Sequence, residues 1–147
     1  DTDFIFRQTG LSSIIENLLP SFEKYEFIFE VKEIYEHWDE ENNWANQRIT
    51  INQTNYTILK NYDELGWGET AQRFAQIVNL ELEKQGKNLR AYIAMGWNDG
   101  QIVFLTDQLF EYITNTYENI YRRPTKIEEW ARLNQVPQLD YGLISVE

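Results

Sequence analysis

The sequence predicts an α+β protein in which an antiparallel sheet, built from hairpins, is covered by helices. Segments with helical periodicity alternate with pairs of short β-rich segments, and each pair is joined by a turn too short for a parallel crossover. The 147 residues contain 42% hydrophobic and 15% aromatic side chains. This composition is sufficient for one compact core, so residues 1–147 are expected to form a single α+β domain.

The N-terminal region changes from helical to strand-like periodicity. Aliphatic side chains at helical spacing predict a helix over residues 11–19, which should end at Pro20. From Tyr25 to Val31, aromatic and β-branched side chains alternate with charged ones, which is the pattern of a half-buried strand. A helix can also be drawn through the apolar residues between Tyr25 and Trp38, but their aromatic and β-branched content favours the strand.

A hairpin and the clearest helix of the chain follow. The β-rich segments Arg48–Ile51 and Tyr56–Leu59 flank a short polar stretch, which predicts that they pair and, with the preceding strand, form a three-stranded antiparallel unit. Apolar residues then recur at helical spacing over 69–85, and Gly86 suits the position that terminates such a helix. The side chains expected to pack on the sheet from this helix are Phe74, Val78 and Leu82.

A second hairpin is predicted in the C-terminal half. The segments Arg90–Met95 and Gln101–Thr106 flank the sequence Asn98–Asp99–Gly100, whose residues tolerate the positive φ angles of a tight turn. Because the chain is built from hairpins and not from βαβ crossovers, the strands of both hairpins are expected in the same antiparallel sheet.

Two further helices and a tail complete the predicted fold. Thr106 is placed to cap the first helix, and Thr125 and Glu128 have the spacing of a capping box ahead of the second. Pro137 should end the second helix, since proline cannot continue it. The apolar residues of the tail, 138–147, are expected to add an edge strand.

Negative charge is concentrated in one short stretch. The chain has 24 Asp and Glu against 13 Lys and Arg, a net charge of −11. Between Glu23 and Glu41 stand eight carboxylates and two lysines, so more than half of the excess lies in this stretch. Aromatic rings, including Trp38 and the nearby Trp44, are interleaved with these acids. Such a surface suits a basic protein partner better than nucleic acid or an anionic membrane.

The acidic stretch also has a simpler interpretation, in which its acids form the solvated face of a half-covered sheet. Carboxylates on adjacent β positions repel one another, however, and cost stability unless a cationic partner relieves them. The residues predicted to bind a partner are Glu26, Glu30, Glu33, Glu36, Trp38, Asp39, Glu40, Glu41 and Trp44, with Trp97 and Asp99 at the tip of the second hairpin.

No pattern of catalytic or cofactor-binding residues is present. His37 is the only histidine, and although acids surround it, a zinc site needs several His or Cys ligands and the chain has no Cys. No serine stands in a nucleophile elbow, and the glycine-containing segments 66–68 and 96–100 lack the spacing of a phosphate or dinucleotide loop. The protein is therefore expected to be no enzyme and to need no metal or cofactor.

Nucleic acid and membranes are not expected as partners. A pI of about 4.5 opposes phosphate binding, so the basic cluster should instead pair with acids elsewhere. This cluster consists of Arg122, Arg123, Lys126 and Arg132. No apolar run approaches the roughly 20 residues of a spanning helix. The absence of cysteine favours a reducing compartment, so a cytoplasmic location is expected.

In overall character the chain resembles the immunity proteins that bacteria pair with secreted toxins in contact-dependent inhibition and related polymorphic systems. Small size, acidity, aromatic content and the lack of cysteine and catalytic motifs carry this resemblance, and the segments Gly66–Phe74 and Asn98–Leu105 look like landmarks of such a family. The resemblance implies tight binding to a cognate toxin, often a basic nuclease, whose active site or substrate path would be blocked.

Two other classes of function remain open at this point. A nucleic-acid mimic that inhibits a defence nuclease would place carboxylates at phosphate-like spacing over a long surface. A small carboxylate-dependent enzyme would instead show a concave pocket that holds an Asp or Glu with a strongly shifted pKa.

Overall fold

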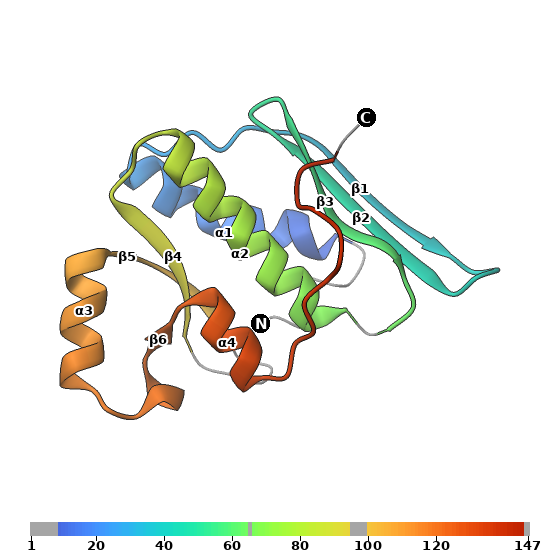
Figure 1. Cartoon of the computed structure of the whole chain (residues 1–147). Helices are drawn as coiled ribbons and strands as arrows, with labels where there is room; N and C mark the ends of the chain where they lie inside the picture. Colours follow the sequence, from blue (N-terminus) through green and yellow to red (C-terminus); the bar gives the residue numbers. More distant parts are fainter. Residues whose placement is uncertain (1–8, 65, 95–99, 146–147) are drawn as a thin grey trace.

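Helices and hairpins alternate along the chain in the computed structural model, which describes residues 9–64, 66–94 and 100–145 (Figure 1). The described elements are α1 (Gly10–Lys24), β1 (Val31–Asp39), β2 (Trp44–Ile51), β3 (Thr54–Tyr62), α2 (Trp67–Lys84), β4 (Leu89–Ala94), β5 (Gln101–Thr106), α3 (Asp107–Thr116), the 3₁₀ helix η3 (Ile120–Arg122), β6 (Pro124–Thr125) and α4 (Ile127–Leu133). None of the described helices combines the length and apolar character needed to cross a bilayer.

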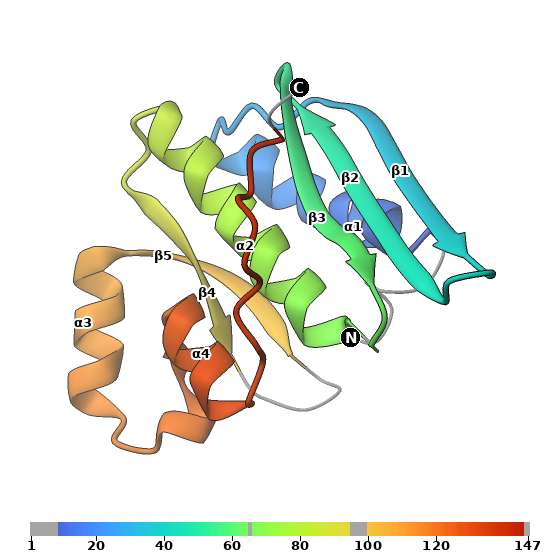
Figure 2. The same ribbon diagram turned by 45° about the vertical axis from the view of Figure 1, so that its right-hand side comes forward.

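The described strands form two antiparallel sheets of three strands each. Sheet A has the order β1-β2-β3, with Tyr35 opposite Arg48, and sheet B has the order β5-β4-β6, with Tyr92 opposite Val103. The predicted α+β class is confirmed, as is the pairing within each hairpin. The expectation that both hairpins share one sheet is wrong, because α2 packs against β3 on one side and β4 on the other (Figure 2).

The helix α2 lies at the centre of this single α+β domain, as Figures 1 and 2 both show. Its predicted core residues Phe74, Val78 and Leu82 are all buried, and they share one hydrophobic core with residues of α1, both sheets and α4. The helix ends close to its predicted limit, where Gly86 adopts the positive φ of 64° that favours glycine. One core therefore connects the two sheets through α2.

The helix α1 does not end at Pro20 as predicted but continues to Lys24. Proline inside a helix removes one backbone hydrogen bond and costs about 3 kcal/mol. The added turn buries Phe22, whose ring centroid lies 4.9 Å from that of Phe27, 4.9 Å from that of Phe29 and 5.6 Å from that of Phe104. This packing offsets the local cost, because burial of a phenylalanine side chain contributes a stabilisation of similar size.

The strand predicted from Tyr25 begins only at Val31. Phe27 and Phe29 are buried and alternate with exposed neighbours, as the periodicity indicated, but their segment does not pair with another strand. Its backbone groups bond instead to side chains: Gln85 both accepts from the N–H of Ile28, at 2.9 Å, and donates to its carbonyl, at 2.8 Å. Burial thus follows the sequence pattern while the hydrogen bonds do not.

The C-terminal region confirms one of the two predicted caps. The Leu109 amide donates to the Thr106 hydroxyl at 3.2 Å, so Thr106 caps α3. The capping box of Thr125 and Glu128 is wrong, since Lys126 holds the N-cap position of α4 and the Thr125 hydroxyl donates to the carbonyl of Ile93 at 3.2 Å. Pairing of β6 with β4 places Thr125 inside sheet B instead of at a helix end.

The tail lies along β3 without forming the predicted strand. Tyr56 and Ile144 form a single antiparallel bridge. The Thr57 amide donates to the Leu143 carbonyl at 2.7 Å, and the Ser145 amide donates to the Asn55 carbonyl at 2.9 Å. This edge of sheet A is therefore covered by the tail.

Candidate functional site

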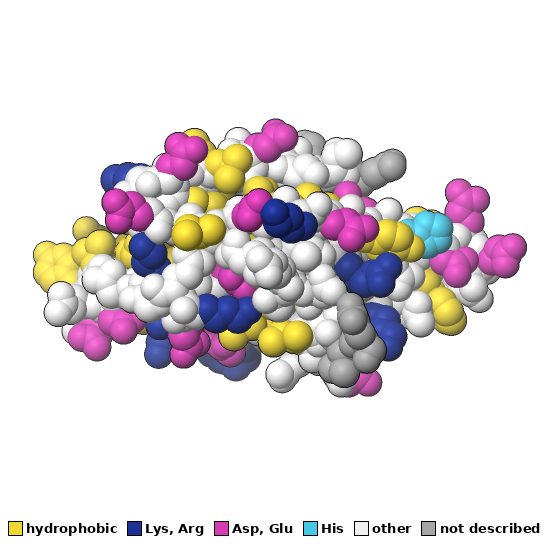
Figure 3. Space-filling model, turned by 90° about the horizontal axis from the view of Figure 1, so that it is seen from above, with side chains coloured by type: hydrophobic (Ala, Val, Ile, Leu, Met, Phe, Trp, Pro, Cys, Tyr) yellow, Lys and Arg dark blue, Asp and Glu magenta, His cyan; other side chains and the backbone are white. Residues whose placement is uncertain are grey.

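The acidic stretch forms an arm that extends from the body of the protein. We define the acidic arm as residues 31–44, which comprise β1, the turn after it and Trp44 at the start of β2. The turn lies far from the helices in Figure 1, and Figure 3 shows Asp and Glu side chains gathered at this end of the molecule beside His37. The hairpin thus presents the acids of its turn at one extremity.

Three carboxylates of the acidic arm are exposed and unpaired within the described parts of the chain. Glu33 on β1 and Glu40 and Glu41 in the turn are exposed. None of them forms a side-chain hydrogen bond or an ion pair with a described residue. These three carboxylates of the acidic arm are therefore available to a partner.

Two other predicted residues of the acidic arm have structural partners. Glu36 accepts from the Thr9 amide at 2.8 Å and from the Gln47 side-chain amide at 3.4 Å. Asp39 accepts from both the backbone and the side chain of Asn42, at 3.1 Å and 2.9 Å, and these hydrogen bonds hold its pKa below the ordinary value. Glu36 fixes the arm to the start of α1, and Asp39 stabilises the turn.

The remaining predicted residues are divided among other parts of the chain. Glu26 lies in the turn after α1 with a φ of 51°, and Glu30 forms an ion pair with Lys32. Trp38 is 43% exposed on the arm, and Trp44 is half-buried at the start of β2. Trp97 and Asp99 lie outside the described residues. The predicted set is therefore only partly brought together, and its compact part is the arm.

His37 is exposed on the outer face of β1, with its ring centroid 6.1 Å from that of Tyr35. Within the described parts of the chain, no group of three His, Asp or Glu side chains is placed to bind a metal ion. The arm therefore offers an acidic surface and not a set of metal ligands.

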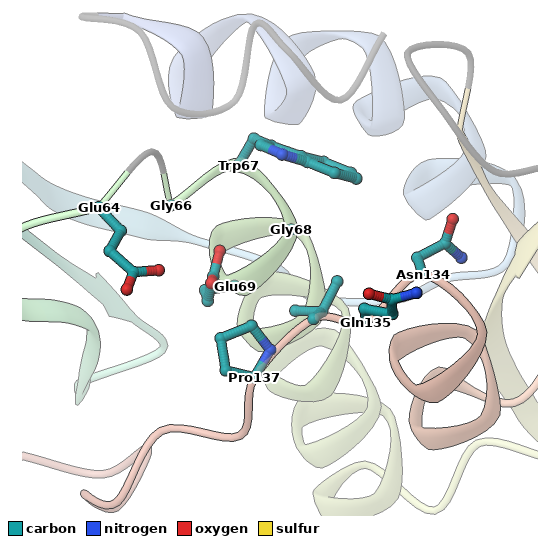
Figure 4. Close-up of a pocket in the computed structure, with 9 residues that line it drawn as sticks. Glu64, Gly66, Trp67, Gly68, Glu69, Asn134, Gln135 and Pro137 are labelled. Carbon is teal, nitrogen blue, oxygen red and sulfur yellow. The ribbon is translucent and has the colours of Figure 1, made fainter.

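A pocket that the sequence did not indicate lies at the start of α2 (Figure 4). It has a volume of about 490 Å³ and is lined by Glu64 and residues 66–69 on one side and residues 134–137 on the other. The Tyr62 hydroxyl donates to Glu69 Oε1 at 2.5 Å and lies 3.3 Å from Glu64 Oε2. Burial, and then the bond to Glu69, raises the pKa of Tyr62.

This pocket joins two parts of the fold. A Cβ added at Gly68 would lie 2.6 Å from Val136 Cγ2, so only glycine permits this close approach. Trp67 packs its ring edge-to-face on Trp130, with centroids 6.3 Å apart. Glu69 is hydrogen-bonded to Tyr62 and only 6% exposed. The pocket therefore lies where α2 packs against the segment after α4.

A groove crosses the outer face of sheet A and was also missed by the sequence. Its volume is about 460 Å³, and its walls include Tyr35 of β1 and Tyr141 of the tail. Arg48 stacks on Tyr35, with the guanidinium carbon 4.4 Å from the ring centroid. Arg73, which is buried, donates to the carbonyls of Tyr141 and Gly142, at 3.0 Å and 2.7 Å, and so fixes the tail. No local signal in the sequence joins these distant segments.

The basic cluster near α4 does not form the predicted ion pairs. None of Arg122, Arg123, Lys126 and Arg132 forms an ion pair with a carboxylate of a described residue. Arg123 Nε is buried without a hydrogen-bond partner in the same part of the chain. We find no structural reason for this arrangement.

Comparisons of the chain with protein-family models, with curated proteins and with solved structures gave no match.

Proposed function

We propose that this chain is an acidic protein-binding inhibitor, of the kind represented by immunity proteins, and that it neutralises a basic protein partner bound at the acidic arm. The observation that carries the proposal is the uncompensated charge of Glu33, Glu40 and Glu41 on an extended hairpin. A projecting acidic surface attracts a basic partner over distance and raises the association rate.

The aromatic residues of the acidic arm supply contact area for such a partner. Trp38 and Trp44 lie at the two ends of the β1–β2 turn, and each leaves part of its ring accessible. Tryptophan is enriched among the residues that dominate binding energy, because its ring buries a large area with few torsions to fix. The carboxylates would then raise the rate at which the partner associates, and the tryptophan rings would supply the contact area that keeps it bound.

The location of the carboxylates favours a protein partner over the two other classes of function. A nucleic-acid mimic needs acids at phosphate-like spacing along an extended surface, whereas Figure 3 shows Asp and Glu side chains interspersed with Lys and Arg over the body of the molecule. An enzyme that works through a carboxylate needs an Asp or Glu in a pocket whose side chain is free to act on a substrate. Glu69, in the pocket of Figure 4, instead accepts a hydrogen bond from Tyr62. Binding by the arm therefore remains the better-supported function.

Photo-crosslinking in cells of the source organism tests the proposal. The photoreactive residue p-benzoylphenylalanine would replace Glu40 on the acidic arm or, as a matched control, Glu111, which is exposed on α3. We expect the arm position to capture a protein of net positive charge and the control position to capture none. The captured protein should lose its own activity when mixed with this chain.

The proposal is contradicted if both positions capture the same proteins, or if the protein captured from the arm is acidic. The inhibitory role is also contradicted if the captured protein keeps its activity in the presence of an excess of this chain.

A further inference from the structure

The two edges of sheet A differ. The β3 edge is covered by the tail through the amides of Thr57 and Ser145. At the other edge, β1 pairs with β2 alone among the described strands, and Figure 2 shows β1 as the outermost strand of the sheet. The strand is nine residues long, so one side of it offers a row of backbone donors and acceptors.

Charge determines which strand can pair with this edge. Charged side chains on an edge strand normally discourage pairing, and another copy of β1 would bring its own carboxylates against Glu33 and Glu36. A basic strand meets no such repulsion, since opposite charges on paired strands stabilise each other. The acids of β1 thus oppose self-association while favouring one kind of partner.

We propose that β1 accepts a basic extended segment of the partner as a fourth, added strand of sheet A. This inference rests on the proposed function and specifies how the partner binds. Main-chain hydrogen bonds to β1 would supply affinity, and Lys or Arg side chains opposite Glu33 would supply specificity. Tyr35 and His37 lie on the same outer face as Glu33, so they flank the added strand on that face.

Three synthetic peptides of nine residues test this binding mode. In each, lysine alternates with threonine or valine; one is unmodified, the second carries N-methyl groups on all its lysines, and the third carries them on all the other residues. Successive amides of a strand point to opposite sides, so only one methylated set faces β1. The two methylated peptides have the same charge and act as controls for each other.

Affinity is measured by NMR titration, and exchange protection is measured for the amides of β1. We expect the unmodified peptide and one methylated peptide to bind and to protect β1, and the other methylated peptide to bind at least about tenfold more weakly, since each lost hydrogen bond costs up to about a factor of ten. On the protein, Glu33→Lys should weaken binding several-fold, and Glu83→Lys on the exposed side of α2 should not.

Equal affinity of all three peptides would overturn strand addition and leave the proposed attraction of a basic partner intact. Failure of all three to bind at low salt would contradict both proposals. Protection of β3 or sheet B in place of β1 would also overturn the inference.

Discussion

Carboxylates serve opposite purposes in α2 and in the acidic arm. On α2, Glu69 and Glu81 are buried, at 6% and 2% exposure, and both accept hydrogen bonds from other elements. On the arm, Glu33, Glu40 and Glu41 are exposed and bond to no described residue through their side chains. The same residue type therefore stabilises the fold in one region and leaves charge available for binding in the other.

The cluster around Glu81 shows how hydrogen-bond donors compensate the charge of a buried carboxylate. Its carboxylate accepts from Lys84 Nζ at 2.8 Å, from Asn52 Nδ2 at 2.8 Å and from the Tyr56 hydroxyl. Burial, and then the bond to Glu81, raises the pKa of Tyr56. Donors from α2, from β3 and from the turn between β2 and β3 thus surround one buried charge, whereas the arm supplies no comparable donors to Glu33, Glu40 or Glu41.

The largest expected effect comes from removing Glu81. The substitution Glu81→Ala leaves the buried Tyr56 hydroxyl and the Asn52 amide without this acceptor, and we expect it to lower the free energy of unfolding by about 3 kcal/mol. The matched substitution Glu83→Ala, at an exposed position of the same helix, should change it by less than about 0.5 kcal/mol. Urea unfolding measures both. Equal effects would show that the cluster does not stabilise the fold.

A smaller loss is expected at the start of α2. Tyr62→Phe removes the hydroxyl that donates to Glu69 and leaves a buried carboxylate short of a donor. The free energy of unfolding should fall by about 1–2 kcal/mol. Tyr112→Phe, on the exposed side of α3, is the control and should have almost no effect. A stability unchanged by Tyr62→Phe would mean that Glu69 finds its stabilisation elsewhere.

The pH dependence of stability should distinguish Glu81 from the acids of the arm. Burial opposes its ionisation most strongly, but the bonds from Lys84, Tyr56 and Asn52 together outweigh burial and hold the pKa of Glu81 below its ordinary value of 4.5. A lowered pKa in the folded state gives stability that is fully present above pH 4.5 and is lost as the pH falls through the folded value.

The measurement compares urea unfolding of the natural chain and of Glu81→Gln between pH 7 and pH 3. The difference in the free energy of unfolding should shrink as the pH falls below 4.5. A difference that stays constant over this range would contradict the assignment of a stabilising ionised Glu81.

The smallest effect on stability is expected at the arm. Reversal of Glu33, Glu40 and Glu41 to lysine should change the free energy of unfolding by less than about 0.5 kcal/mol, because surface positions without partners contribute little. Thermal unfolding would detect a larger change. A loss comparable to that of Glu81→Ala would show that the arm acids support the fold.

The sequence predicted those elements of the fold that are determined by local residue patterns. The periodicity of α2, the two hairpins and the Thr106 cap were all predicted from neighbouring residues. The continuation of α1 past Pro20 is accompanied by packing of Phe22 against three rings, and one of these, Phe104, is distant in the sequence, so helical periodicity could not reveal it. Thr125 failed as a cap for the same reason, since β4 bonds its hydroxyl.

The candidate site was predictable as a region and not residue by residue. Charge density located the acidic stretch, but Glu36 and Asp39 have structural bonds that depend on Thr9, Gln47 and the geometry of the turn. The sequence contains no signal that separates these acids from Glu33. Only the three-dimensional arrangement distinguishes a bonded carboxylate from an available one.

The association rate with the captured partner tests the central claim most directly. Reversal of Glu33, Glu40 and Glu41 to lysine is compared with reversal of three exposed acids elsewhere, Glu83, Glu111 and Glu118, which changes the net charge equally. Stopped-flow measurement over a range of salt should show the arm variant associating at least about tenfold more slowly at low salt, with a flatter salt dependence, and the control variant close to the natural chain. Equal rates for the two variants would contradict a binding role for the arm.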